Sequence, residues 1–160
     1  MNDLIIEKLK EQFSHNVEAT NEFRGDLTVQ IRKSSLLKVG ELLKGDPDLS
    51  FDLIVDVFGI DMYRPEGRFE VVYNLYSLKN NKYLRLKIVV EEDDCTAPSV
   101  TGIWSGADWH ERETYDMFGI KFTGHPDLRR MYMPEEYQHF PMRKDFPLMG
   151  IPDSIPLPRK

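Results

Sequence analysis

The chain has 160 residues, of which 41% are hydrophobic and 30% are charged, and its formal net charge is -6 at pH 7. These values are typical of one soluble globular domain with a core of its own. The negative charge, with no basic face to offset it, argues against a nucleic-acid partner. Cys95 is the only cysteine, which excludes a disulfide and an iron–sulfur cluster held by this chain alone.

No run of about 18 apolar residues occurs, so the sequence predicts no membrane-spanning helix. The first residues carry an acid, Asp3, and lack the basic flank and apolar stretch of a signal peptide. We therefore expect a cytosolic chain.

The first predicted element is an amphipathic helix at residues 3–14, where apolar side chains recur at helical spacing. Two alternating runs follow, at residues 17–23 and 27–31, and residues 24–26 (Arg-Gly-Asp) separate them. This arrangement predicts a β-hairpin.

A second helix is expected to begin at Ser34 or Ser35 and to stop at residues 45–47 (Gly-Asp-Pro). Three strands are expected next, and Asn80-Asn81 joins the last two because Asn tolerates positive φ in a tight turn. They predict an antiparallel meander with one buried and one more polar face. The side chains expected to share a face are, strand by strand, Phe51, Leu53, Val55 and Val57; Phe69, Val71, Tyr73 and Leu75; and Leu84, Leu86, Ile88 and Val90.

A third helix is predicted from about Ser105 or Asp108 to Phe118, with Gly119 at its end. Trp109, Tyr115 and Phe118 are expected to anchor it to the sheet. The sequence thus predicts a two-layer α+β fold in which helices pack on a mostly antiparallel sheet of about five strands, in the order α-β-β-α-β-β-β-α.

Little regular structure is expected after Gly119, since six of the ten prolines lie between Pro134 and Pro158. This part also carries many large apolar side chains, which a solvated linker would not hold. We therefore expect an α+β domain at residues 1–122 and an extended interaction arm at residues 123–160, buried against this domain or a partner.

The stretch from Trp109 to Arg130 is dense in histidine, acids and bases, and admits three interpretations. His110-Glu111 begins like a zinc-binding H-E-x-x-H motif, but Thr114 replaces the second histidine. Glu113 and Asp116 lie three residues apart and would be the catalytic pair of a hydrolase. Arg112 lies four residues before Asp116 and would keep that acid ionised, which favours a structural helix laced with charges. No nucleotide-binding glycine motif occurs.

The third interpretation is an interface with another protein. Paired cations lie beside acids and aromatic residues in two loops, at residues 125–130 and 141–147. Arginine and aromatic residues are enriched at such interfaces.

Three segments resemble the signature of a known family. Residues 111–120 read Glu-Arg-Glu-Thr-Tyr-Asp-Met-Phe-Gly-Ile, residues 124–130 read Gly-His-Pro-Asp-Leu-Arg-Arg, and residues 143–147 read Arg-Lys-Asp-Phe-Pro. Together with the order of elements, they resemble the 30 kDa subunit of respiratory complex I, the proton-pumping NADH:quinone oxidoreductase.

The resemblance implies a non-redox, architectural subunit on the cytoplasmic side of the membrane. The chain would bind the 49 kDa quinone-site subunit and adjacent iron–sulfur subunits, and would reach the membrane only through them. FMN, iron–sulfur clusters and quinone would lie on those partners, with no cofactor, metal or catalytic residue on this chain. The equivalent subunit of a membrane-bound hydrogenase or of a ferredoxin- or F420-linked complex is the alternative. The residues expected at the partner interface or in the signature are Glu111, Arg112, Glu113, Asp116, His125, Asp127, Arg129, Arg130, Arg143, Lys144 and Asp145.

Overall fold

The computed structural model describes residues 1–151, and its elements follow the predicted order with two short strands added. The helices and strands form at the positions predicted from the spacing of apolar residues in the sequence. The elements are α1 (Asn2–Phe13), β1 (Val17–Phe23), β2 (Asp26–Ile31), a 3-10 turn (Lys33–Ser35), α2 (Leu36–Gly45), β3 (Leu53–Asp61), β4 (Phe69–Ser77), β5 (Lys82–Val90), β6 (Thr96–Pro98), α3 (Ala107–Phe118) and β7 (Lys121–Thr123).

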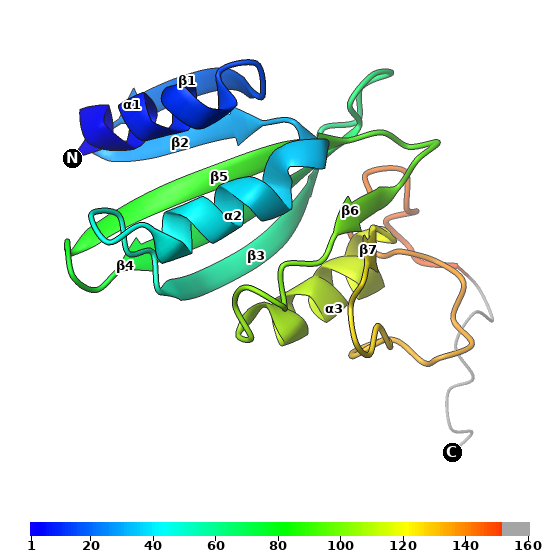
Figure 1. The fold of residues 1–160 in the computed structure, drawn as a ribbon. Coiled ribbons are helices and arrows are strands. Elements are labelled where there is room, and N and C mark those ends of the chain that lie inside the picture. The colour runs from blue at the N-terminus through cyan, green and yellow to red at the C-terminus, as the bar shows by residue number, and fades with distance from the viewer. Residues whose placement is uncertain (152–160) are drawn as a thin grey trace.

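Five strands form one mixed sheet in the order β1-β2-β5-β4-β3, and α1 and α2 lie across one of its faces (Figure 1). β3, β4 and β5 are the predicted antiparallel meander, and β1 and β2 are the predicted hairpin. β2 and β5 run parallel to each other and join the two units. Asn81 has φ 48° in the turn between β4 and β5, as expected for this residue. The predicted α+β fold is therefore confirmed.

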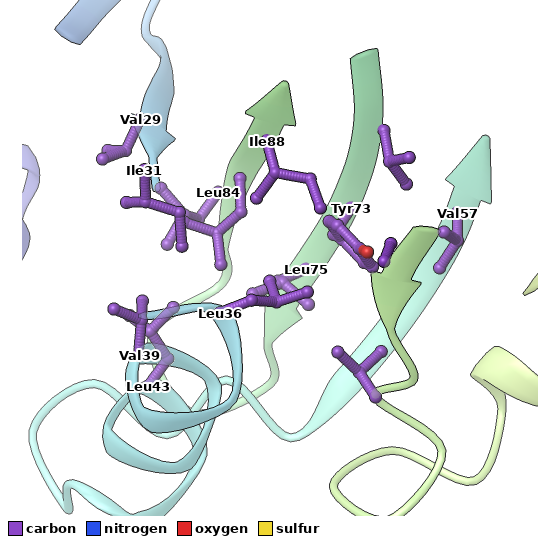
Figure 2. Packing of buried hydrophobic residues seen from close by; sticks show 14 of the residues in the cluster. Val29, Ile31, Leu36, Val39, Leu43, Val57, Tyr73, Leu75, Leu84 and Ile88 are labelled. Atoms are coloured by element: carbon purple, nitrogen blue, oxygen red, sulfur yellow. The ribbon is translucent and has the colours of Figure 1, made fainter. Parts of the chain in front are cut away.

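The core lies between this sheet face and the helices. In Figure 2, Leu36, Val39 and Leu43 of α2 point toward Leu75 and Leu84 of the sheet. The predicted apolar faces of β4 and β5 are both fully buried, in agreement with their alternation.

Of the face predicted for β3, Phe51 is buried as expected, but Leu53 and Val55 are not. Leu53 is 44% exposed and Val55 is 46% exposed, although Val57 is buried as expected. The pairing register shifts around Val55, which has no partner on β4. Such a bulge adds one residue to the strand, so the residues before it face the opposite way from the one expected. Ile54 therefore lies opposite the buried Leu75, whereas its neighbours Leu53 and Val55 are exposed.

α3 packs along β3, the edge strand of the sheet (Figure 1). The Thr114 hydroxyl donates to the Val57 carbonyl at 3.2 Å, and the Phe118 ring fills the space where Gly59 lacks a side chain. Gly119 ends the helix with φ 79°, as predicted.

The prediction that Trp109 anchors this helix is wrong, because its side chain is 62% exposed. The buried stripe of α3 includes Ala107, Glu111 and Thr114, and Trp109 lies away from it on a helix with 3.6 residues per turn. Trp104, just before the helix, is 3% exposed and donates its indole N–H to the Phe51 carbonyl at 2.9 Å. The tryptophan that anchors this region is therefore the one outside the helix.

Two short strands were not expected from the sequence. β6 and β7 pair in parallel beside α3, and β7 extends one residue beyond the boundary expected at residues 122 and 123. Residues 124–151 contain no helix or strand, and residues 152–160 of the expected arm lie outside the described part. None of the helices within residues 1–151 has the length and hydropathy needed to cross a membrane.

Candidate functional site

Asp116 on α3 is the centre of the first charged cluster. Its side chain is fully buried, and Oδ1 accepts a hydrogen bond from Nη1 of Arg130 at 2.7 Å. Oδ2 accepts from three consecutive main-chain N–H groups, those of Met131, Tyr132 and Met133, at 3.0, 2.6 and 3.0 Å. One carboxylate of the predicted signature therefore fixes residues 130–133 on the helix.

Asp116 is held in its ionised form by this segment. Burial alone would raise its pKa, but the N–H groups of Met133, Tyr132 and Met131 and the Arg130 guanidinium together lower the pKa below its ordinary value of 3.8. The expectation that Arg112 plays this role is wrong. Arg112 instead lies 4.8 Å from the Trp109 ring and donates to the carbonyls of Arg129 and Arg130.

A second cluster fixes the segment farther along the chain. Asp61, at the end of β3, accepts from Nε and Nη2 of Arg68 at 3.2 and 3.0 Å and from the main-chain N–H of Lys144 at 2.8 Å. Nη2 of Arg68 also lies 2.9 Å from Asp145, and Nη1 donates to Glu92. Lys144 is thus joined to the end of β3, and Asp145 to Arg68 just before β4.

Asp61 and Arg68 were missed in the sequence. A signal was present, because Asp61 continues the alternation of inward positions through Val57 and Gly59. A carboxylate at an inward position indicates a buried polar partner. The sequence does not indicate that Arg68 is this partner, or that a further donor, the main-chain N–H of Lys144, lies more than 80 residues away.

Arg143 lies between the two clusters. Its Nε donates to the Phe118 carbonyl at 2.6 Å, and its guanidinium lies 4.9 Å from the Phe69 ring and 4.7 Å from the Phe140 ring. The segment passes so close to the end of α3 that a Cβ on Gly119 would lie 2.6 Å from Phe140.

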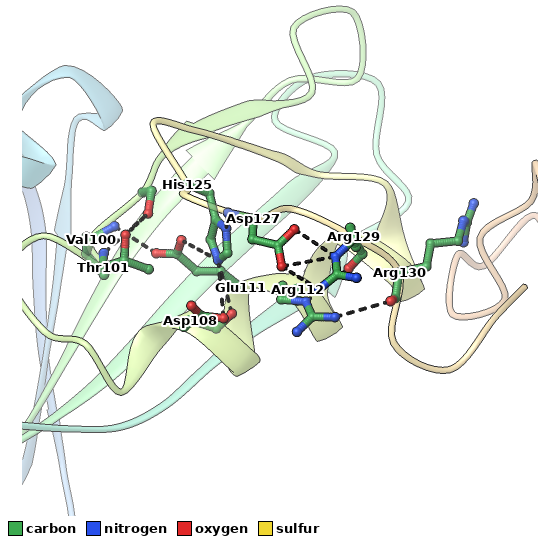
Figure 3. Close-up of polar contacts among 10 residues, drawn as sticks. Val100, Thr101, Asp108, Glu111, Arg112, His125, Asp127, Arg129 and Arg130 are labelled. Atoms are coloured by element: carbon green, nitrogen blue, oxygen red, sulfur yellow. Dashed lines mark hydrogen bonds and ion pairs between the residues drawn. The ribbon is translucent and has the colours of Figure 1, made fainter. Parts of the chain in front are cut away.

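Glu111 and His125 form a third cluster, where the turn after β7 passes beside α3 (Figure 3). Glu111 is fully buried, and its Oε1 accepts from the Val100 N–H at 2.7 Å, whereas Oε2 has no hydrogen-bond partner among residues 1–151. Nε2 of His125 lies 4.0 Å from this oxygen and 3.2 Å from the Asp108 carbonyl oxygen. Burial raises the pKa of Glu111 to about 7, against the opposing effect of the Ser99 hydroxyl and the Val100 N–H.

The remaining predicted residues lie apart from these clusters. Arg129 and Asp127 pair with each other at 2.7 Å in an exposed position, and Glu113 is exposed. Glu113 and Asp116 therefore do not share an environment, and Asp116 already accepts hydrogen bonds from Arg130 and from the N–H groups of residues 131–133. This geometry gives no support to a hydrolase. No group of three or more His, Cys, Asp or Glu side chains within residues 1–151 could hold a metal ion.

The family of the chain follows from its match to known proteins. The family model described as "Respiratory-chain NADH dehydrogenase, 30 Kd subunit" matches residues 29–152, which include all three clusters. The chain belongs to this family. The resemblance found in the sequence is confirmed, and the chain is one subunit of an oxidoreductase complex.

Curated relatives agree with this assignment over nearly the whole chain. The C subunit of the NADH-quinone oxidoreductase of Roseiflexus sp. (strain RS-1) is 45% identical over 147 residues, which are 92% of this chain and 84% of the relative. The same subunit of Geotalea uraniireducens (strain Rf4) is 43% identical over 155 residues, which are 97% and 93% of the two chains.

Two solved structures share the fold. The trypsin-resistant fragment (1-134) of Nqo5 is 31% identical, with a TM-score of 0.65, and covers 80% of this chain and 100% of its own. A chain of the membrane-bound sulfane sulfur reductase, an archaeal respiratory membrane complex, has a TM-score of 0.77 over 92% of this chain and 86% of its own. At 22% identity the second likeness concerns the fold alone.

Proposed function

We propose that this chain is a non-redox, architectural subunit in the peripheral arm of a proton-pumping NADH:quinone oxidoreductase. It holds the 49 kDa quinone-site subunit and neighbouring iron–sulfur subunits in place. One observation carries the proposal: buried ionic contacts fix an irregular segment on the domain, while large apolar side chains of that segment remain exposed. A segment built in this way suits a docking surface for another protein.

The exposed side chains lie in the part of the chain that we propose as the interaction arm, residues 123–160. Within its described part, Tyr132, Met142, Leu148 and Met149 are exposed, and Trp109 is exposed on the neighbouring helix. Aromatic residues and methionine are enriched at protein interfaces. Because the arm is already fixed on the domain, it loses little conformational freedom when a partner binds.

The charged signature residues support a role without redox chemistry on this chain. Asp116, Arg130 and Arg143 are all engaged in contacts that fix the arm. We place FMN, the iron–sulfur clusters and quinone on partner subunits, and the chain on the cytoplasmic side of the membrane through those partners. The alternative is the equivalent subunit of a membrane-bound hydrogenase or of a ferredoxin- or F420-linked complex.

The test is a pull-down of the tagged chain from detergent-solubilised native membranes, with mass spectrometry of the bound proteins. The wild-type chain is expected to recover a quinone-site subunit with flavin- and cluster-bearing subunits. Recovery of hydrogenase subunits would favour the alternative. Recovery of the chain alone would contradict both.

The contribution of the arm is tested by the double variant Leu148→Asp with Met149→Asp. We expect its isolated chain to unfold at the same denaturant concentration as the wild type, since both side chains are exposed, but to recover much less of the complex. The matched control is Phe23→Asp with Leu78→Asp, which changes two exposed apolar side chains on other elements. Equal recovery from both double variants would contradict the proposed role of the arm.

A further inference from the structure

The buried carboxylate of Glu111 takes no part in the contacts of Asp116 and Asp61 described above, and its surroundings leave its charge uncompensated. Within the described part of the chain, its Oε2 is buried without a hydrogen-bond partner. Asp108 of the same helix disfavours its ionisation, and the Ser99 hydroxyl and the Val100 N–H face it from the loop after β6. From β4, the buried Tyr73 hydroxyl also lacks a partner, and its pKa is raised by burial and then by the charge of Glu111.

His125 faces Glu111 from the turn after β7, and its hydrogen bonds fix where its proton lies. Its side chain is fully buried, and Nδ1 accepts the Asp127 N–H at 3.0 Å. A nitrogen that accepts a hydrogen bond carries no proton, so the neutral ring carries its proton on Nε2. This N–H points toward the Asp108 carbonyl and Glu111.

We propose that Glu111 and His125 form a proton-operated latch that holds residues 123–130 on α3 while Glu111 is protonated and loosens when Glu111 ionises. When the proton leaves Oε2 for solvent, a buried negative charge remains 4.0 Å from Nε2 of His125. The His125 ring is held in place by the Asp127 N–H, 3.0 Å from Nδ1, and by the Asp108 carbonyl oxygen, 3.2 Å from Nε2. It cannot move closer to Oε2 without giving up these contacts.

The ionised state can therefore be satisfied only when these contacts of His125 open or when Glu111 reaches solvent. The other charged side chains nearby do not compensate the charge of an ionised Glu111. Arg129 pairs with Asp127 at the surface, and Arg112 donates to main-chain carbonyls. Because the pKa of Glu111 is about 7 in the folded chain against an ordinary 4.5, the latch is closed in mildly acidic solution and loosens as pH rises through neutrality.

The latch is tested on the purified full chain by the rate of trypsin cleavage after Arg129, between pH 6 and pH 8.5. Each rate is divided by that of a free peptide with the same sequence, which removes the pH dependence of trypsin itself. The wild-type ratio is expected to rise severalfold across neutrality, and by no more than about tenfold per pH unit, the limit for one proton. Glu111→Gln is expected to give a flat ratio.

Glu113→Gln is the matched control, because it removes an exposed carboxylate from the same helix and should keep the wild-type profile. Carboxyl NMR of the wild-type chain labelled in glutamate gives a second measurement that needs no variant to fold. One glutamate should titrate near neutral pH. If every glutamate titrates in the ordinary acidic range, or if Glu111→Gln keeps the wild-type cleavage profile, the latch does not exist.

Discussion

Asp116 and Asp127 belong to the same signature, yet their surroundings give them different roles. Asp116 is fully buried and bonds to Arg130 and to three main-chain N–H groups, whereas Asp127 pairs with Arg129 in water. Removing one partner of a buried ion pair leaves the other charge without compensation, whereas an exposed pair contributes little. Burial, and not charge, therefore decides which signature acid is essential to the fold.

Asp116→Asn is expected to lower the free energy of unfolding by about 3 to 5 kcal/mol, the usual cost of breaking a buried ion pair. The amide of asparagine cannot accept all the donors that now bond to the carboxylate. Denaturant unfolding of the isolated chain measures the change. Asp127→Asn should give no measurable change, and a similar loss in both variants would contradict the different roles of the two acids.

At the scale of elements, the end of α3 is where the helix and the arm meet. Gly119 ends the helix with positive φ and also leaves room for Phe140 and Arg143. A side chain there would meet Phe140 at 2.6 Å and Nη2 of Arg143 at 2.8 Å. The same glycine therefore ends the helix and allows the arm to dock.

Gly119→Ala separates these two roles when it is compared with Gly124→Ala. Gly124 has φ 84° but nothing within 4 Å of an added Cβ, so its substitution measures only the backbone strain, about 1 to 2 kcal/mol. Gly119→Ala should cost more and should speed trypsin cleavage after Arg143 and Lys144, because the arm is displaced. Equal costs and equal cleavage in the two variants would show that the arm does not depend on this contact.

At the scale of the whole molecule, stability depends on pH through buried acids whose pKa values are shifted in opposite directions. The pKa of Glu111 is raised from an ordinary 4.5 to about 7. Its contribution to the free energy of unfolding is therefore complete below pH 4.5 and is lost as pH rises through 7. For Asp61 and Asp116, burial acts to raise the pKa. The side-chain and main-chain donors around each outweigh it, so their contribution is complete above 3.8 and is lost as pH falls.

The free energy of unfolding should therefore be greater near pH 5 than near pH 8, by up to about 3 kcal/mol from Glu111. Glu111→Gln should remove most of this difference, and Glu113→Gln should keep it. Denaturant unfolding at both pH values measures it. A wild-type chain that is more stable at pH 8 would contradict the assignment of a neutral buried Glu111.

Much of the fold could be predicted because the apolar pattern has the period of the element that it forms. β4 and β5 both have the predicted buried face, although the first five residues of β4 are buried on both faces. The face predicted for β3 was partly wrong because the bulge at Val55 changes the pairing register, and nothing in the sequence indicates this bulge. The prediction for Trp109 was wrong because the position of this residue on α3 directs its side chain to solvent.

The candidate site could be predicted only as a set of residues. The signature identified Asp116, Arg130 and Arg143, but their pairing depends on how the arm returns to the domain. Asp61 ends β3 and Arg68 precedes β4, and neither was among the residues expected at the site, so their contacts with Lys144 and Asp145 were missed. Whether these residues contact a partner remains a prediction.

The two anchoring acids differ in where their donors come from, and this has a consequence for the order of folding during synthesis. Asp61 has Arg68 as a partner only seven residues away. The donors that bond to Asp116 all lie 14 to 17 residues later in the chain. While those residues are still inside the ribosome, docking of α3 would bury an unpaired carboxylate. The sheet can therefore form first, and α3 completes its packing only after residues 130–133 have emerged.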